Sequence, residues 1–103
     1  MKKRVCHYAL SRIKKLILEN KFLITKSALK TAIEDFSFLE ADILNQILTL
    51  ENEHFYKSMT SHFDHTLWQD VYKKQINDSK AYVKVQISDE NSVIISFKKE
   101  AEL

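Results

Sequence analysis

The chain has 103 residues, 45% of them apolar, so it can bury one modest core and is expected to form a single domain over residues 1–103. It contains no glycine, no proline and one cysteine, which excludes a glycine-rich loop for nucleotide phosphates and an internal disulfide bond. The net charge is only +2, but residues 1–30 carry nine Lys or Arg against one acid, so the N-terminal third suits a polyanion or an acidic protein partner.

Three helices are predicted in the first half of the chain. The first spans residues 8–20, and the second spans residues 26–36 with Thr25 as its N-cap. The third begins after Ser37, which has the spacing of a capping box with the acid three positions later, and it stops near Leu50. The apolar stripes that predict these helices are Leu10, Ile13, Leu16 and Ile17, then Leu29, Ala32, Ile33 and Phe36, then Ile43, Leu44, Ile47 and Leu48.

Four strands are predicted in the second half, where aromatic and β-branched residues become frequent. Helices followed by consecutive strands predict an α+β fold, with the N-terminal helices packed on a C-terminal antiparallel sheet. Alternating residues predict that one strand buries Ala81, Val83, Val85 and Ile87, and that the next places Val93, Ile95 and Phe97 on one face. The strands span residues 55–61, 66–73, 81–87 and 93–98, with a loop over 61–65 and a hairpin turn over 89–92.

The segment FYKSMTSHFDHTLWQDVY, from Phe55 to Tyr72, is the most informative part of the chain. Its order of residues is too long to arise by chance, and it resembles the signature of the MqsR family. These proteins are the messenger-RNA-cutting toxins of bacterial toxin–antitoxin pairs. The resemblance covers essentially the whole chain and implies a compact, RelE-like single domain. Matching residues outside the segment include Lys3-Arg4, His7, Leu10, Lys14-Lys15-Leu16, Ser27-Ala28 and Ser96-Phe97.

An antiparallel sheet that is covered by helices on one face leaves its other face open for a ligand. Four polar residues come from the four predicted strands and can be placed on that face, and the resemblance implies that they form the active site. These four are Lys57, Gln69, Tyr82 and Lys98. Further candidates for contacts with RNA are His7, Met59, His65, Lys73 and Lys84.

Such residues suit RNA cleavage without a metal, in which the ribose 2′-OH attacks the adjacent phosphate. The ammonium groups of Lys57 and Lys98 would stabilise the extra negative charge of the transition state. One lysine could instead carry a proton if burial or a second cation lowered its pKa. Tyr82 could position or relay a proton, and Gln69 could bridge a phosphate oxygen and a base edge.

Two other chemistries deserve comparison. His62 and His65 share a loop, so a ribonuclease with a histidine base and a histidine acid is an alternative. The same histidines with Asp64 could be interpreted as metal ligands, but one cysteine and scattered histidines lack the spacing of a zinc site. We therefore expect no metal and no cofactor. Trp68 is expected in the core more than on an RNA base.

The resemblance implies ribosome-independent cleavage at short GC-containing sites of messenger RNA, leaving a cyclic phosphate. It also implies a cognate antitoxin with a zinc-binding N-terminal domain and a DNA-binding C-terminal domain, so that DNA is contacted only through the antitoxin. No apolar stretch approaches the roughly 18 residues of a membrane span, and we expect a cytoplasmic protein with no membrane partner. Where the family has an arginine–proline pair after Tyr72, this chain has Lys73-Lys74, so the exact cleavage sequence does not transfer.

Two alternatives remain open for the function. The chain could be a non-catalytic nucleic-acid-binding module that uses its basic helices. It could also be a regulatory module that binds only the antitoxin. Retention of all four implied active-site residues favours the endoribonuclease, since neither alternative needs the four together.

Overall fold

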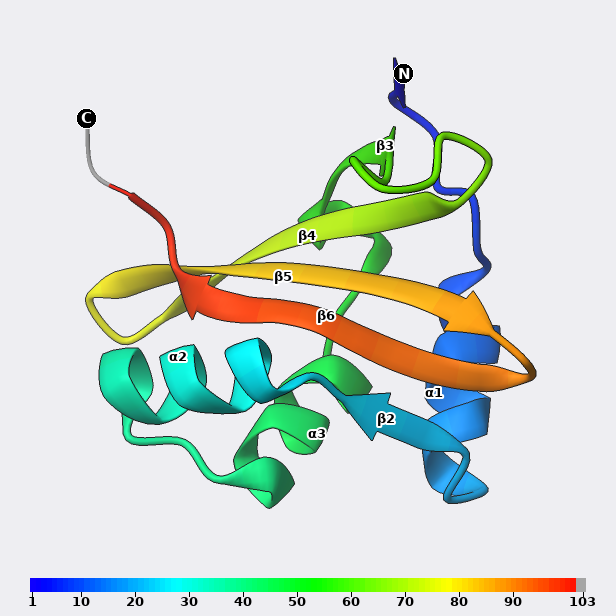
Figure 1. The fold of residues 1–103 in the computed structure, drawn as a ribbon. Helices are drawn as coiled ribbons and strands as arrows, with labels where there is room; N and C mark the ends of the chain where they lie inside the picture. Colours follow the sequence, from blue (N-terminus) through cyan, green and yellow to red (C-terminus); the bar gives the residue numbers. More distant parts are fainter. Residues whose placement is uncertain (102–103) are drawn as a thin grey trace.

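The computed structural model describes residues 1–101, in which three helices lie on one side of a six-stranded sheet (Figure 1). The predicted α+β fold, with helices first and the sheet second, is confirmed. The helices are α1 (Leu10–Leu18), α2 (Lys26–Phe36) and α3 (Glu40–Leu48), followed by a short 3-10 helix, η1 (Asn52–His54). The strands are β1 (Lys2–Lys3), β2 (Phe22–Ile24), β3 (Phe55–Thr60), β4 (Trp68–Ile76), β5 (Ser79–Ser88) and β6 (Asn91–Lys99).

The strand order across the sheet is β1-β3-β4-β5-β6-β2. Strands β3 to β6 form an antiparallel meander, and β1 pairs antiparallel with β3 at one edge. At the other edge β2 pairs with β6 in the parallel sense, which departs from the purely antiparallel sheet that we predicted. The sequence did not predict β1 and β2, because strands of two and three residues are too short to show an alternation.

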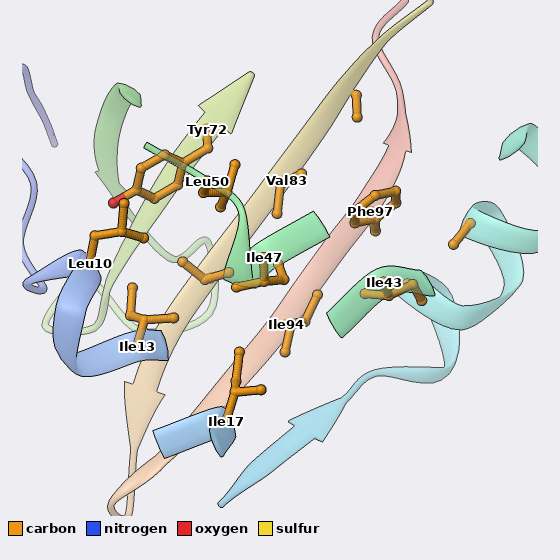
Figure 2. Close-up of a cluster of buried hydrophobic side chains, with 14 of the residues drawn as sticks. Leu10, Ile13, Ile17, Ile43, Ile47, Leu50, Tyr72, Val83, Ile94 and Phe97 are labelled. Atoms are coloured by element: carbon orange, nitrogen blue, oxygen red, sulfur yellow. The ribbon is translucent and has the colours of Figure 1, made fainter. Parts of the chain in front are cut away.

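The hydrophobic core lies between the helices and one face of the sheet, which we call the covered face (Figure 2). Tyr72 and Phe97 are its largest buried side chains, and α1 buries the predicted stripe that includes Ile13. Burial of each such side chain stabilises the fold by roughly 1.5–3 kcal/mol. The other face of the sheet, which carries no helix, we call the open face (Figure 1).

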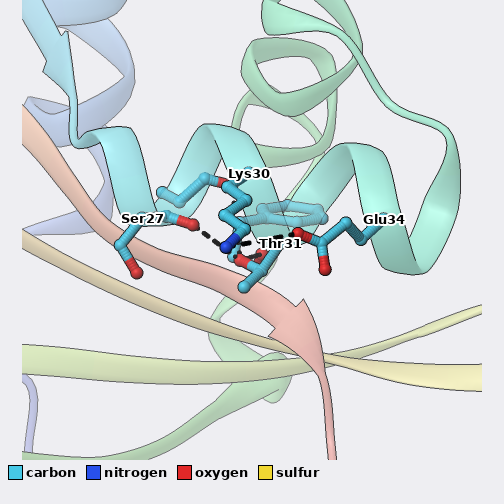
Figure 3. A network of polar contacts seen from close by, with 6 residues as sticks. Ser27, Lys30, Thr31 and Glu34 are labelled. Carbon is cyan, nitrogen blue, oxygen red and sulfur yellow. Dashed lines mark hydrogen bonds and ion pairs between the residues drawn. The ribbon is translucent and has the colours of Figure 1, made fainter.

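Helix α2 approaches the sheet through small residues, so the predicted stripe is wrong in part. Ala28 and Ala32 are fully buried, whereas Leu29 and Ile33 are 37% and 49% exposed. The Thr31 hydroxyl donates to the Phe97 carbonyl oxygen at 2.6 Å, an approach that larger residues on this side would prevent. The exposed side of the helix carries an ion pair, Lys30–Glu34, at 3.9 Å (Figure 3). Thr25 caps the helix as predicted, since its hydroxyl accepts from the Ala28 N–H at 3.1 Å.

The start of α3 differs from the prediction. Ser37 ends α2 in the left-handed conformation, with φ of 59°, and does not cap the next helix. The N-cap position is Leu39, whose N–H donates to the Asp42 carboxylate at 2.9 Å. The spacing of Ser37 and Glu40 recurs two residues later in Leu39 and Asp42, and the second pair is the one that begins the helix. The predicted burial of Ile43 and Ile47 is confirmed.

A β-bulge in β6 corrects the predicted faces of that strand. Lys84 pairs with Ser96, but the next residue of β5, Val85, pairs with Ile94, so β6 contains one extra residue. The bulge turns Ile94 onto the covered face together with Phe97, while Val93 and Ile95 stay partly exposed. A simple alternation cannot anticipate such an insertion.

Turns are made without glycine. Asn20 after α1 and Asn77 between β4 and β5 take positive φ angles of 63° and 53°, the conformation that asparagine tolerates well. The β5–β6 hairpin turns through Asp89 and Glu90, with φ of 50° and 61°, and Asn91 already belongs to β6. Glu90 is the least suited of these residues to that conformation.

Candidate functional site

The strand register arranges the open face in three rows that cross the sheet, because directly paired residues share a face. We call them the cationic row, the middle row and the amide row, and successive rows lie about 7 Å apart along each strand. The cationic row contains Lys73, Tyr82 and Lys98. The middle row contains Lys57, Val71, Lys84 and Ser96, and the amide row contains Met59, Gln69 and Gln86. All four implied active-site residues therefore lie on the open face.

A second β-bulge adds a tyrosine to this face. The register of β3 against β4 shifts between Phe55 and Lys57, which leaves Tyr56 as the extra residue. The Lys73 ammonium lies 3.7 Å from the centre of the Tyr56 ring, and the Lys57 ammonium lies 5.3 Å from it. Bulges of this kind redirect side chains next to functional sites. Here the bulge places an aromatic ring between two lysines.

Around the cationic row the surface forms a shallow hollow of about 370 Å³. Lys98 lies across Tyr82, with its ammonium 5.3 Å from the centre of the tyrosine ring. The residues that line the hollow are Tyr56, Lys57, Lys73, Tyr82, Lys98, Glu100 and Ala101. The hollow thus combines three lysines, two tyrosine hydroxyls and one carboxylate.

Three of these groups, Lys73, Glu100 and Tyr82, have pKa values that their surroundings shift. The Glu100 carboxylate pairs with the Lys73 ammonium at 2.5 Å, and this hydrogen bond raises the pKa of Lys73 and lowers that of Glu100. This shift favours the charged form of Lys73. Burial raises the pKa of Tyr82 above its ordinary value, so its hydroxyl keeps its proton and acts as a hydrogen-bond donor.

In the middle row, the surroundings of Lys84 lower its pKa. Burial is the main cause that lowers the pKa of Lys84, and the charges of Lys98 and Lys57 lower it further. Val71, between Lys57 and Lys84, is fully buried although no helix covers it. The aliphatic stems of its long neighbours can cover such a residue while their charged ends stay accessible.

The amide row is a buried chain of hydrogen bonds. Gln69 is 8% exposed and donates its side-chain N–H to the Gln86 side-chain oxygen at 2.9 Å. Gln86, 7% exposed, donates in turn to the Ser88 hydroxyl at 2.7 Å. The chain of donors sets the orientation of the Gln69 amide. The side-chain oxygen of Gln69, Oε1, accepts no hydrogen bond from the described residues, so it could accept one from a ligand.

The structure does not bring the two candidate histidines to the open face. His7 belongs to the N-terminal segment, which Asp70 binds on the covered side: the Asp70 carboxylate accepts from the His7 N–H at 3.0 Å and from the Tyr8 N–H at 2.9 Å. The His7 ring stacks on Trp68 with centres 5.6 Å apart, and the Lys3 ammonium lies 4.2 Å from the Trp68 ring centre.

His65 lies exposed in the loop between β3 and β4. Beside it, Asp64 accepts from the backbone N–H and the hydroxyl of Thr66, and these bonds lower the pKa of Asp64. In residues 1–101 no three His, Cys, Asp or Glu side chains come together as metal ligands. Within the same range, no helix is both long and apolar enough to cross a membrane.

Sequence reasoning missed Tyr56, Glu100 and Gln86. Tyr56 belongs to the quoted segment, but alternation places it opposite Lys57, and only the bulge brings both to one face. Glu100 follows the last predicted strand, so no pattern pointed to it. Gln86 alternates with the predicted buried residues Val85 and Ile87, but the alternation assigns it no role. It follows Val85, which pairs with Asp70, and this register brings Gln86 beside Gln69.

Comparison with known proteins adds two findings. The family described as the motility quorum-sensing regulator, toxin of MqsA, matches residues 5–99. The protein named mRNA interferase toxin MqsR, from Escherichia coli (strain K12), is 40% identical over 101 residues, which cover 95% of this chain and 98% of that protein. The family match includes β3, β4, β5 and β6, the strands that contribute to the hollow.

Proposed function

The chain belongs to the motility quorum-sensing regulator family of toxins, and we propose that it is the toxin of a type II toxin–antitoxin pair that cleaves messenger RNA as an endoribonuclease. The observation that carries this proposal is the hollow of the open face, where three lysines and two tyrosines gather with one carboxylate. The name of the Escherichia coli relative, an mRNA interferase, supports the same activity.

The proposed reaction uses the substrate's own 2′-OH as nucleophile and needs no metal and no ribosome. Attack on the adjacent phosphate builds negative charge on the non-bridging oxygens. The ammonium groups of Lys57 and Lys98, on opposite sides of the hollow, would stabilise that charge, each by roughly 3–4 kcal/mol if it acts as a preorganised donor. Tyr82 belongs to β5, a strand between β3 and β6, and its protonated hydroxyl would donate to the 2′-oxygen or to the phosphate.

Gln69 is proposed to contact a nucleotide next to the cleaved one. Its amide row lies two rows, or about 14 Å, from the cationic row, and its orientation is set by Gln86. An amide held in one orientation can distinguish donors from acceptors on a base edge. This arrangement supports recognition of a short sequence, which we propose contains G and C as in the family.

The partner is proposed to be an antitoxin of the MqsA type, with a zinc-binding N-terminal domain and a DNA-binding C-terminal domain. DNA would be contacted only through this partner, in the cytoplasm. Edge strand β2 lies beside the helices and exposes 60% of Leu23. We expect the antitoxin to dock at this edge, away from the hollow. If so, an uncleavable RNA and the antitoxin should bind together; mutually exclusive binding would mean that the antitoxin covers the hollow.

Neighbouring residues of β6 provide a matched test of catalysis. Lys98 lies in the hollow, whereas Lys99 pairs with Ala81 and so belongs to the covered side. Lys98→Ala should reduce the cleavage rate of a defined RNA by about 10²- to 10³-fold, while Lys99→Ala should cleave as the wild type does. Equal activity of both variants would remove the hollow from the mechanism. RNA binding by the wild type without any cleavage would favour the non-catalytic module.

A further inference from the structure

Lys84 occupies a distinctive place on the open face. It lies in the middle row, next to the hollow, with Val71 as its partner on β4 and Ser96 as its partner on β6. Its side chain is half-buried, and its ammonium lies 5.9 Å from the centre of the Tyr82 ring. Lys84 therefore lies beside Tyr82, one of the two tyrosines that line the hollow.

The charged groups in the rows around Lys84 are cations: β3 contributes Lys57, β4 contributes Lys73 and β6 contributes Lys98. Two tyrosines lie among them, since the Tyr56 ring lies beside Lys57 and Lys73 and the Tyr82 ring lies beside Lys84 and Lys98. Glu100 is the one carboxylate that lines the hollow, and it is bound to Lys73. Among the described residues, no carboxylate forms an ion pair with Lys84. Neighbouring positive charges without a carboxylate partner disfavour the charged form of a lysine.

We propose that Lys84 is the group that takes the proton from the attacking 2′-OH of the RNA. The inference rests on the proposed endoribonuclease function and assigns the base of that reaction to a residue outside the four that the family resemblance implies. In this proposal the lysines of the open face have different roles in the reaction. Lys57 and Lys98 stabilise the phosphate, while Lys84 exchanges a proton.

The proposed step is balanced as follows. The neutral amine of Lys84 accepts the 2′-OH proton as the bond between the 2′-oxygen and phosphorus forms. The bond between phosphorus and the 5′-oxygen breaks, and the departing 5′-oxygen takes a proton from water. Lys84 then returns its proton to the resulting hydroxide. The products are a 2′,3′-cyclic phosphate and a free 5′-OH.

Electrostatics supports this role. Burial, followed by the charges of Lys98 and Lys57, lowers the pKa of Lys84 and so increases the fraction of neutral amine near neutral pH. Bound RNA brings negative charge that counteracts part of the repulsion from Lys98 and Lys57, whereas the burial of Lys84, the larger cause, remains in the complex. A lysine with a lowered pKa is a recognised general base.

The test compares Lys84→Arg with the wild type and with the control Lys80→Arg. Arginine keeps the positive charge but stays protonated throughout the accessible pH range. Lys80 lies on the same strand and the same side but is exposed, whereas Lys84 is half-buried. Single-turnover cleavage of a defined RNA would be measured from acidic to alkaline pH, and binding would be measured with the same RNA carrying a 2′-O-methyl group at the cut.

We expect wild-type cleavage to accelerate with rising pH and to level off below the ordinary lysine pKa of about 10.4. Lys84→Arg should bind the methylated RNA like the wild type, cleave about 10²- to 10⁴-fold more slowly and lose the rise with pH. Lys80→Arg should retain both the rate and the rise.

A wild-type rate that does not change with pH, or a Lys84→Arg variant with wild-type rate and profile, would overturn the inference. Lys84→Gln provides a second variant if the arginine does not fit, since it should lose cleavage and the pH rise together. A wild type that cleaves no RNA would refute the proposed function itself. A cleaving wild type with a fully active Lys84→Arg would refute only the role of Lys84.

Discussion

The two faces of the sheet handle polar groups in opposite ways. On the covered face the charged residue Asp70 is fully buried, and its carboxylate is satisfied by the N–H groups of His7 and Tyr8. On the open face four lysines lie in adjacent rows, and one carboxylate, Glu100, lines the hollow. The covered face pairs its charge, whereas the open face holds an excess of positive charge.

This difference indicates what each face has been shaped to do. Adjacent like charges destabilise a folded protein, so a group of four lysines with one carboxylate partner, Glu100, does not favour the stability of the sheet. It suits a polyanion that supplies the missing negative charge on binding. Stability therefore resides in the covered face, and the proposed activity resides in the open face. Substitutions on the two faces should separate the two properties.

The largest effect is expected from the core. Phe97→Ala removes a fully buried ring that packs on Phe36 and Phe38, and should cost about 3–5 kcal/mol of unfolding free energy. Urea denaturation would measure the loss. The fraction that remains folded should cleave RNA at the wild-type rate per molecule. A stable Phe97→Ala protein that no longer cleaves would contradict the separation of the two faces.

The open face should show the reverse pattern. Lys57→Ala removes a preorganised charge from the hollow and should raise the barrier to cleavage by roughly 3–4 kcal/mol, or about 10² to 10³ in rate. Its unfolding free energy should change by less than about 0.5 kcal/mol, as for most surface substitutions. Cleavage kinetics and a melting curve on the same preparation would show both. If the variant melts early while its folded fraction cuts normally, Lys57 is structural.

A buried polar group on the covered face provides a third comparison. Asp70→Asn keeps the size of the side chain but removes the charge that accepts N–H groups from the N-terminal segment. Loss of a charge-assisted hydrogen bond should cost about 1.5–3 kcal/mol. Hydrogen exchange should show faster exchange of the His7 and Tyr8 amides. Unchanged exchange and stability would mean that the segment is held by the stacking of His7 on Trp68.

The smallest predicted effect is a gain in stability far from both faces. Glu90 takes a φ of 61° in the β5–β6 turn, a conformation that costs a residue other than glycine roughly 1–2 kcal/mol. Glu90→Gly should therefore raise stability by about 1 kcal/mol after the entropic cost of glycine is subtracted, and the melting temperature by about 4–8 °C. Cleavage should not change. A lower melting temperature would show that Glu90 makes a compensating contact.

The sequence predicted the fold class and most elements because periodicity reports which residues are buried. It placed Ile13, Ile43 and Val83 in the core correctly. It failed for Leu29 and Ile33, since a helix that lies close to a sheet buries its alanines and leaves larger residues outside. The spacing of apolar residues along a helix does not determine how closely that helix packs on a strand. The sequence alone therefore could not show that α2 buries its alanines.

The sequence predicted the residue types of the site and the face of the sheet on which they lie. It did not predict how the side chains are arranged there. The four implied residues do lie on the open face, and alternation together with the family resemblance was enough to place them there. The bulges in β3 and β6 were not predictable, because a strand with one extra residue has no recognisable composition or alternation that indicates where the extra residue lies. As a result Tyr56 was missed. The lowered pKa of Lys84 depends on burial and on two charges from other strands, which no sequence pattern shows.

The central claim is that the open face cleaves RNA through the substrate's 2′-OH, without a metal. The most direct test uses wild-type protein, excess EDTA and two versions of one RNA, with ribose or 2′-deoxyribose on the 5′ side of the cut. The account predicts that the ribose substrate is cleaved in EDTA to a 2′,3′-cyclic or 3′-phosphate end and that the deoxy substrate is inert. Loss of cleavage in EDTA that Mg²⁺ or Mn²⁺ restores, or cleavage of the deoxy substrate, would contradict it.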